Sequence, residues 1–337
     1  MLKEIQYENF RVIRDARLPL SQVTVIVGPN GGGKSTVLQS LELLRKSVGD
    51  YDRLVSIDRR ESGASVRLSF VWEAPGDELK TVISWMKGSN PTKSIVRGST
   101  PANRHESREH DEVTSRIRTF SFDPSAIANP VSLVPQMQLE RSGQGLAGVL
   151  DGLRDAWPER FEALNAELDH WLPEFNRIVF SVPAQGMRGF GLRRKSDGLI
   201  LLAHDLSGGT LFAVALLTLA HLPQPPSIVG LEEPDHGMHP RLLRKVQDAI
   251  HRLAYPSDHG EKRTATQVIV TTHSPYFLDL FKDHPEEVIV ANKDDRGVTF
   301  QRLTDRPRMD EILPDGPLGD LWYSGLLGGV PAEPVQP

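Results

Sequence analysis

A glycine-rich segment at residues 28–35 constrains this chain more than any other feature of its sequence. It runs Gly-Pro-Asn-Gly-Gly-Gly-Lys-Ser and fills every fixed position of the pattern G-x-x-x-x-G-K-[ST]. The β-branched run Val23–Val27 before it is typical of a strand buried on both faces of a parallel sheet. Residues 35–47 after it carry apolar side chains at helical spacing. The sequence therefore predicts a strand, a tight turn and a helix in succession.

The residue types in this turn suit a polyphosphate ligand. Glycine lets backbone N–H groups curl around a phosphate, and the N-terminus of the following helix adds partial positive charge. The Lys34 ammonium can reach the β and γ oxygens of ATP, and the Ser35 hydroxyl can ligate Mg²⁺. An ordinary glycine-rich strand–helix turn is the alternative. The predicted nucleotide-binding residues here are Asn30, Gly31, Gly32, Gly33, Lys34, Ser35 and Thr36.

Two adjacent carboxylates follow a second apolar run, at residues 228–234 (Ile-Val-Gly-Leu-Glu-Glu-Pro). A strand that ends in acids beside a phosphate-binding loop is the Walker B arrangement. We expect Glu232 to hold Mg²⁺ and Glu233 to polarise the attacking water as general base. Asp is more common at the first position, and Glu is one methylene longer. Two acids after a strand also occur in solvated turns, so this prediction depends on the motif at residues 28–35.

Two further segments extend the predicted site. A third buried run, at residues 268–271, leads to Thr272-His273-Ser274, and by position His273 would contact the γ-phosphate. A lone histidine at a strand end is more often structural or merely exposed. Ser207-Gly208-Gly209 begins an apolar helix, and the N–H groups at a helix start favour an anion. By itself this triplet is a common helix cap, but it precedes the Walker B strand by about twenty residues.

These motifs, in this order, resemble the ABC ATPase superfamily, with residues 206–210 similar to its signature motif and His273 to its switch histidine. Asn9-Phe10-Arg11 near the N-terminus is similar to the RecF, SMC and OLD branch. Residues 232–240 and 318–325 resemble segments of bacterial "AAA family" predicted ATPases of that branch. The resemblance implies an α/β fold of the P-loop NTPase type, an ABC-type nucleotide-binding domain with a mixed sheet and a helical lobe.

The resemblance also implies partners and catalytic roles. Two chains would form a homodimer with two ATP molecules, each held between the phosphate-binding loop of one chain and the Ser207–Gly208–Gly209 segment of the other. Lys34, Glu233 and His273 would then be catalytic, with ATP and Mg²⁺ as cofactors. No glutamine stands out as the Q-loop residue, for which Gln136, Gln138 and Gln144 are candidates. A long coiled-coil arm and the nuclease domain of OLD proteins are expected to be missing, so nuclease activity would come from a separate effector.

Three functional interpretations remain open. The first is an ATP-driven switch in a DNA-related, anti-phage defence or repair complex with a separate effector. The second is a transporter ATPase subunit, which the Asn9-Phe10 opening and the Gly-x-His-Pro segment disfavour. The third is a nucleotide-binding regulator with little turnover, against which Glu233 and His273 argue. DNA binding follows only from the resemblance, because the basic groups at residues 193–195 and 241–245 are small.

Composition limits the remaining classes. The 337 residues carry a net charge of −5 and no cysteine, which excludes disulfides, thiolate zinc sites and a cysteine nucleophile. The absence of cysteine fits a cytoplasmic protein. The longest apolar run is about half of what crosses a bilayer, so we expect no membrane partner. We expect one ABC-type domain over residues 1–337. Residues 86–112, rich in Ser, Arg and Asn, are predicted to be a flexible insert, either a mobile loop or a disordered segment, and residues 145–225 a helical lobe.

Overall fold

The computed structural model describes residues 1–46, 49–56, 59, 63–74, 76–295, 297–307, 309–312 and 316–329. Two compact units are interleaved along the sequence. Unit 1 contains Met1–Thr119, Ser227–Leu231 and Gln267–Pro337, and unit 2 contains Phe120–Pro226 and Glu232–Thr266.

Unit 1 is built on two sheets, with strand order β2-β1-β4-β5-β6-β7 in one and β16-β15-β3-β14-β13-β8 in the other, over the described residues. The first is antiparallel. In the second, β3 runs parallel to β14 and β15, while β15 and β16 are antiparallel, so this sheet is mixed as predicted. The strands of the two sheets are β1 (Leu2–Phe10), β2 (Ile13–Pro19), β3 (Val23–Val27), β4 (Val66–Trp72), β5 (Leu79–Trp85), β6 (Thr92–Arg97), β7 (Thr100–Pro101), β8 (Arg118–Phe120), β13 (Ile228–Glu232), β14 (Gln267–Thr272), β15 (Val288–Asp294) and β16 (Gly297–Arg302).

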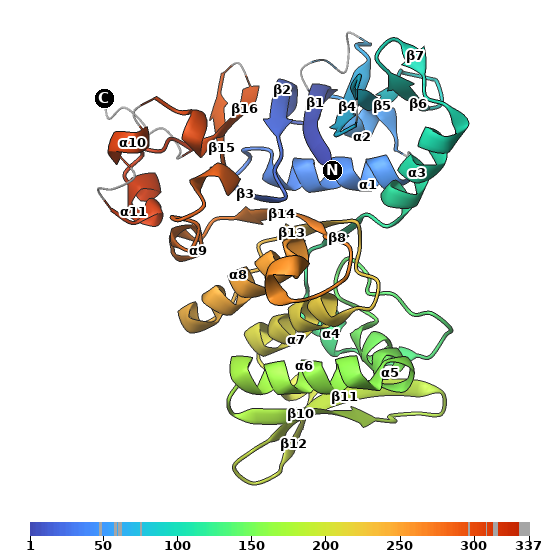
Figure 1. Ribbon diagram of the computed structural model, residues 1–337, viewed down its shortest axis with the longest axis vertical. Coiled ribbons are helices and arrows are strands. Elements are labelled where there is room, and N and C mark those ends of the chain that lie inside the picture. The colour runs from blue at the N-terminus through green and yellow to red at the C-terminus, as the bar shows by residue number, and fades with distance from the viewer. Residues whose placement is uncertain are drawn as a thin grey trace. The chain divides into compact units, whose positions relative to one another are not determined.

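Helix α1 (Lys34–Lys46) packs between these two sheets (Figure 1). Its apolar stripe joins one buried cluster with side chains from both sheets, including Ile5 of β1 and Ile26 of β3. A hydrogen bond of 3.1 Å between the Tyr7 hydroxyl and Ser40 Oγ lies within this core. Residue 47, the predicted end of the helix, lies outside the described residues. Unit 1 also contains α2 (Tyr51–Leu54), α3 (Arg104–Ser115), α9 (Pro275–Asp279), α10 (Met309–Ile312) and α11 (Leu318–Tyr323).

A buried glutamine side chain ties the first strands of the chain to β14. The Gln267 amide accepts a hydrogen bond from the Leu2 N–H at 3.0 Å and donates to the Leu2 carbonyl at 2.7 Å and the Ser21 carbonyl at 2.9 Å. The two bonds to Leu2 are buried, and a buried polar group that loses its partner costs about 1–3 kcal/mol. Gln267 thereby fixes the start of β14, at whose other end His273 follows.

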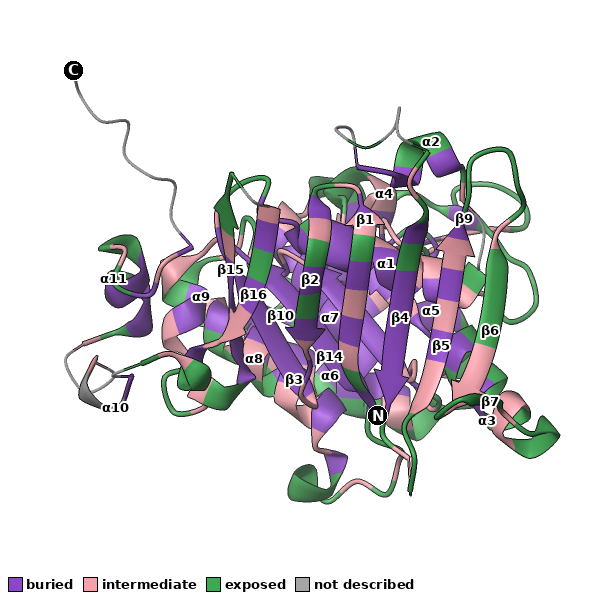
Figure 2. Cartoon of the chain, turned by 90° about the horizontal axis from the view of Figure 1, so that it is seen from above, coloured by how far each residue is buried: buried purple, intermediate pink, exposed green. Residues whose placement is uncertain are grey.

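The segment predicted to be an insert without regular structure, residues 86–112, contains β6, β7 and most of α3. That part of the prediction is wrong, because polar contacts hold the segment in place of apolar ones. Asn103 and Glu106 form a capping box at the start of α3. Its His110 is buried against Thr81, with 2.6 Å between His110 Nε2 and Thr81 Oγ1. Strand β6 has no buried residue, three of its six being exposed and three half-buried, whereas β4 is almost entirely buried (Figure 2). The flexibility of this segment stays a prediction.

Unit 2 packs helices against a small antiparallel sheet of order β10-β11-β12, with β9 pairing with β11. The sheet faces α5 and α6, which contact β11 and β10 respectively. Helix α7 is buried on nearly all sides, as its continuous apolar sequence predicts. The elements of unit 2 are α4 (Pro124–Ala128), β9 (Val131–Ser132), α5 (Leu146–Ala156), α6 (Pro158–Trp171), β10 (Phe175–Ser181), β11 (Met187–Arg194), β12 (Ile200–Leu202), α7 (Gly208–His221) and α8 (Pro240–Ala254).

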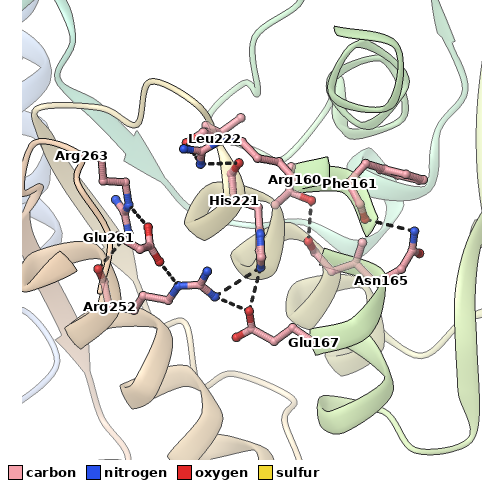
Figure 3. Close-up of polar contacts among 11 residues, drawn as sticks. Arg160, Phe161, Asn165, Glu167, His221, Leu222, Arg252, Glu261 and Arg263 are labelled. Atoms are coloured by element: carbon pink, nitrogen blue, oxygen red, sulfur yellow. Dashed lines mark hydrogen bonds and ion pairs between the residues drawn. The ribbon is translucent and has the colours of Figure 1, made fainter. Parts of the chain in front are cut away.

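An ionic network joins three helices of unit 2 (Figure 3). Arg252 of α8 donates hydrogen bonds to Glu167 of α6 and to Glu261, which lies after α8. At the end of α7, His221 Nε2 lies 2.7 Å from Glu167 Oε2. Arg263 also donates a hydrogen bond to Glu261. Burial alone would raise the pKa of Glu167, but hydrogen bonding to His221 and the charge of Arg252 hold it below its ordinary value. The pKa of Glu261 is lowered against burial in the same way, by Arg263 and Arg252.

We predict that Arg252→Met lowers the free energy of unfolding at pH 7 by about 1–3 kcal/mol, because two partly buried carboxylates lose their shared cation. A carboxyl with a lowered pKa stabilises the fold above its unfolded pKa of about 4.3, and this contribution disappears as pH falls through the folded value. The difference between variant and wild type should therefore shrink below about pH 4. Urea unfolding between pH 3 and 7 measures it.

The control is Arg177→Met, since Arg177 pairs with Glu162 where both side chains are at least half exposed. It should cost less than about 1 kcal/mol. A cost for Arg252→Met that matches this control, or that stays constant down to pH 3, would contradict the assigned role of the network.

Candidate functional site

The glycine-rich loop of unit 1 leaves the sheet at a point that only glycine can occupy. Strand β3 is buried along its whole length, and its Val27 pairs with Val290 of β15. A Cβ added to the next residue, Gly28, would lie 2.5 Å from the Ala291 carbonyl oxygen. The loop therefore crosses β15 in direct backbone contact, which brings residues 28–35 tightly over the end of the sheet.

The loop is shaped around the Lys34 ammonium. Gly31 and Gly33 have φ angles of +74° and +81°, which side-chain-bearing residues rarely adopt. Lys34 Nζ donates hydrogen bonds to the Gly28 carbonyl at 2.8 Å and the Pro29 carbonyl at 2.9 Å, and the lysine is 6% exposed. The first turn of α1 contains no acidic residue, so its N-terminus keeps a net attraction for anions. Of the predicted binding residues, Asn30, Gly31 and Ser35 are exposed, whereas Gly32, Gly33 and Thr36 are buried.

His273 lies at the same edge of the sheet as this loop. Thr272, the last residue of β14, pairs with Val27, so His273 and Gly28 each leave neighbouring parallel strands at one level. The Thr272 hydroxyl accepts a hydrogen bond from the Ser274 N–H at 2.9 Å, and Ser274 Oγ caps α9. The turn that carries His273 is therefore fixed on both sides. Unit 1 thus places the turn of His273 at the end of the sheet where the loop with Lys34 and Ser35 begins, and a shared role of these residues stays a prediction.

The two acids lie where β13 ends and unit 2 resumes. Glu232 is the last residue of β13, and Glu233 has a φ of +45°. Such a backbone costs about 1–3 kcal/mol in a residue other than glycine and is common at functional sites. Arg141 NH2 lies 3.1 Å from Glu232 Oε2, an ion pair that the sequence analysis missed. These two residues are 91 positions apart, and no local sequence pattern connects them.

The Ser207-Gly208-Gly209 segment packs against the residues that follow the acids. Ser207 is the N-cap of α7, and its hydroxyl accepts a hydrogen bond from the Thr210 N–H at 3.1 Å. A Cβ added to Gly209 would lie 2.9 Å from the Gly237 carbonyl oxygen. The start of α7 and the turn after Glu233 therefore form one packed piece of unit 2. The helix-cap pattern accounts for the Ser207 contact, but the contact between Gly209 and Gly237 could not be predicted from it.

The fold and the arrangement of these motifs define an ABC-type P-loop ATPase of the RecF/SMC/OLD-like branch. Residues 48–279 match the family described as "AAA domain, putative AbiEii toxin, Type IV TA system", and the chain belongs to this family. Residues 1–94, which include the glycine-rich loop, match the family described as "AAA ATPase domain". These matches confirm the predicted ATPase family, and the relatives and solved structures that follow confirm the predicted branch and fold class.

Relatives and solved structures agree with this assignment. The chain is 22% identical over 361 residues to an OLD nuclease of Thermus scotoductus, an alignment that covers 93% of this chain and 66% of that protein. It is 23% identical to the UvrABC system protein A of Chlamydia muridarum, covering 78% of this chain and 14% of that protein. The chain therefore spans less than two thirds of the length of either relative.

Two solved structures share the fold. The SMC head domain from Thermotoga maritima superposes with a TM-score of 0.54 at 17% identity, covering 89% of this chain and 98% of that one. The recombination mediator protein RecF-ATPrS superposes with a TM-score of 0.50 at 12% identity, covering 89% of this chain and 98% of that one. None of the helices in the described part of the chain is long and apolar enough to cross a membrane.

We predict opposite effects of two glycine-to-alanine changes in unit 2. Gly209→Ala should destabilise the protein by about 1–3 kcal/mol, because the new Cβ would collide with the Gly237 carbonyl. Gly152→Ala in α5 should stabilise it by about 0.5–1 kcal/mol, because its Cβ meets open space and alanine favours a helix. Thermal unfolding of both variants measures this. A Gly209→Ala protein as stable as the Gly152→Ala protein would show that α7 and residue 237 are not in contact.

Proposed function

We propose that this protein binds ATP with Mg²⁺ and hydrolyses it, and that two chains close around two ATP molecules. The observation that carries the proposal is the position of the Lys34 ammonium. It donates hydrogen bonds to the backbone carbonyls of Gly28 and Pro29 within the glycine-rich loop. A phosphate oxygen is a stronger acceptor than a peptide carbonyl and can replace them. The loop N–H groups, the start of α1 and one buried cation together suit a polyphosphate and few other ligands.

Each predicted site residue has a role in this proposal. Asn30, Gly31, Gly32, Gly33, Lys34 and Thr36 hold the phosphates. Ser35 and Glu232 hold Mg²⁺, Glu233 takes a proton from the attacking water, and His273 contacts the γ-phosphate. Among the described residues no group of three or more His, Cys, Asp or Glu side chains could hold a metal. Hydroxyl and carboxylate oxygens are ligands that Mg²⁺ accepts, so Ser35 and Glu232 would hold an ion that comes with the nucleotide and offsets the charge of its phosphates.

The proposed dimer uses the start of α7. The N–H groups of Gly208 and Gly209 lie in the first turn of this helix, which contains no acidic residue, so they favour an anion. In an ABC-type pair, Ser207, Gly208 and Gly209 of one chain face the ATP held by the other chain. A homodimer is the simplest assembly because one chain carries both kinds of motif. The two units then act as one ABC-type domain, with residues 145–225 as the lobe that presents Ser207.

For the biological role, we propose an ATP-driven switch in a DNA-related process, anti-phage defence or repair, that acts through a separate effector such as a nuclease. The support is the alignment with an OLD nuclease over 93% of this chain and with the UvrABC system protein A. We further propose that the protein works in the cytoplasm, a compartment that a chain without cysteine fits.

The test of this function is Glu233→Gln, which keeps the shape of the side chain and removes its basicity. We expect ATP to bind with unchanged affinity and hydrolysis to fall by about 10²–10⁴-fold. The variant should also accumulate as an ATP-bound dimer, because the pair that hydrolysis would open stays closed. Phosphate release measures the rate, and light scattering with and without ATP measures the dimer.

Glu162→Gln is the matched control, since Glu162 is an exposed acid of unit 2. It should hydrolyse ATP at the wild-type rate. Hydrolysis by Glu233→Gln at that same rate would remove Glu233 from the proposed mechanism, and a wild-type protein that releases no phosphate would refute the ATPase proposal itself.

A further inference from the structure

We propose that Arg141 and the divalent cation compete for Glu232, so that Mg²⁺ has to displace Arg141 when it binds with ATP. This inference rests on the proposed ATPase function and assigns a new residue to its site. The Arg141 guanidinium lies 3.1 Å from Glu232 Oε2, with the arginine side chain 39% and the glutamate side chain 19% exposed. Both residues belong to unit 2.

Arg141 is held in position by a built turn. The Arg141 and Ser142 carbonyls accept hydrogen bonds from the Ser121 and Asp123 N–H groups, both at 2.9 Å, which pairs this segment with the chain just after β8. The Gly143 N–H donates to the Glu140 carbonyl at 2.9 Å and closes the turn. Two backbone hydrogen bonds therefore hold the segment of Arg141 against residues 121–123. The fixed backbone limits the positions that the Arg141 side chain can reach.

Two glycines make this turn possible. Gly143 and Gly145 have φ angles of +88° and +95°. A Cβ on Gly143 would lie 2.4 Å from Ile127 Cγ1, and a Cβ on Gly145 would lie 2.9 Å from the Gln138 carbonyl oxygen. A turn that tolerates no side chain at two positions fixes the backbone from which Arg141 reaches Glu232. This distinguishes the pair from surface ion pairs such as Arg177–Glu162, whose side chains are at least half exposed.

The chemistry of Glu232 makes arginine and Mg²⁺ competitors. A carboxylate accepts charge-assisted hydrogen bonds from a guanidinium, but Mg²⁺ demands near-ideal octahedral oxygen geometry at about 2.0–2.1 Å or a water in between. Two cations at the same carboxylate repel each other, so Mg²⁺ binds Glu232 more readily once the Arg141 guanidinium has left it. Glutamate is one methylene longer than the aspartate that is more common at this position, and from the end of β13 its carboxylate reaches Arg141.

The variant that tests this is Arg141→Met, which keeps much of the aliphatic length and removes the charge. The measurement is the Mg²⁺ concentration that gives half-maximal binding of ATP carrying a methylanthraniloyl fluorophore. Without its competitor, Glu232 should take Mg²⁺ more readily, and the midpoint should fall by about tenfold, the value of one hydrogen bond to a charged group. Arg141→Lys, which keeps the charge but loses the planar fork, should give an intermediate midpoint.

A double-mutant comparison separates competition from a general structural effect. In a Glu232→Gln background, Arg141→Met should leave the Mg²⁺ midpoint unchanged within about twofold, because there is no longer a carboxylate to compete for. Arg177→Met, which removes an arginine of unit 2 from an exposed pair, should leave the wild-type midpoint unchanged. Circular dichroism of each variant confirms that it is folded.

Three results would overturn the inference while leaving the proposed function intact: a midpoint in Arg141→Met equal to that in Arg177→Met, a higher midpoint, or a shift that persists in the Glu232→Gln background. A wild-type protein that binds no nucleotide at any Mg²⁺ concentration would overturn the proposed function and this inference together.

Discussion

The backbone contact between Gly28 and Ala291 is the constraint on which the phosphate-binding half of the molecule depends. Strand β3 is buried between two parallel neighbours, β14 and β15, and the chain leaves it without room for a single methyl group. That close passage makes the following loop turn tightly, so that α1 begins at Lys34 and the lysine folds back onto the Gly28 carbonyl. The same parallel pairing places His273 level with Gly28. A buried strand thereby determines the geometry of a loop that is itself partly exposed.

Unit 2 depends on a different kind of contact. The start of α7 touches the turn after Glu233 through Gly209, and the far end of α7 joins α6 and α8 through His221, Glu167 and Arg252. Helix α7 is therefore held at both ends against the segment that carries the acids and the helix that follows them. In the proposed mechanism, a change at Glu232 or Glu233 reaches Ser207 through these contacts. The Arg141–Glu232 pair lies at the point where such a change would begin.

The elements that could be predicted from the sequence are those that local patterns of apolar residues and glycines determine. The strand at Val23–Val27, the turn and the helix after it follow from periodicity and glycine placement, and all three are present. Helix α3 was missed because its contacts are polar: a capping box and the buried His110 give no apolar stripe. Arg141 was missed because it meets Glu232 across 91 positions, through a turn that needs two glycines at positive φ. The catalytic roles of Glu233 and His273, and the dimer, stay predictions, since they concern states that include ATP.

Calorimetric titration of ATP in the presence of Mg²⁺, into the wild-type protein and into Lys34→Ala, tests the central claim most directly. Lys34 is the buried cation of the glycine-rich loop, and its loss leaves the phosphates without their charge partner inside the loop. The account predicts micromolar binding by the wild type and a loss of about 100-fold or more in the variant, with both proteins folded. Equal affinity in the two proteins would show that ATP does not bind at this loop, and would contradict the account.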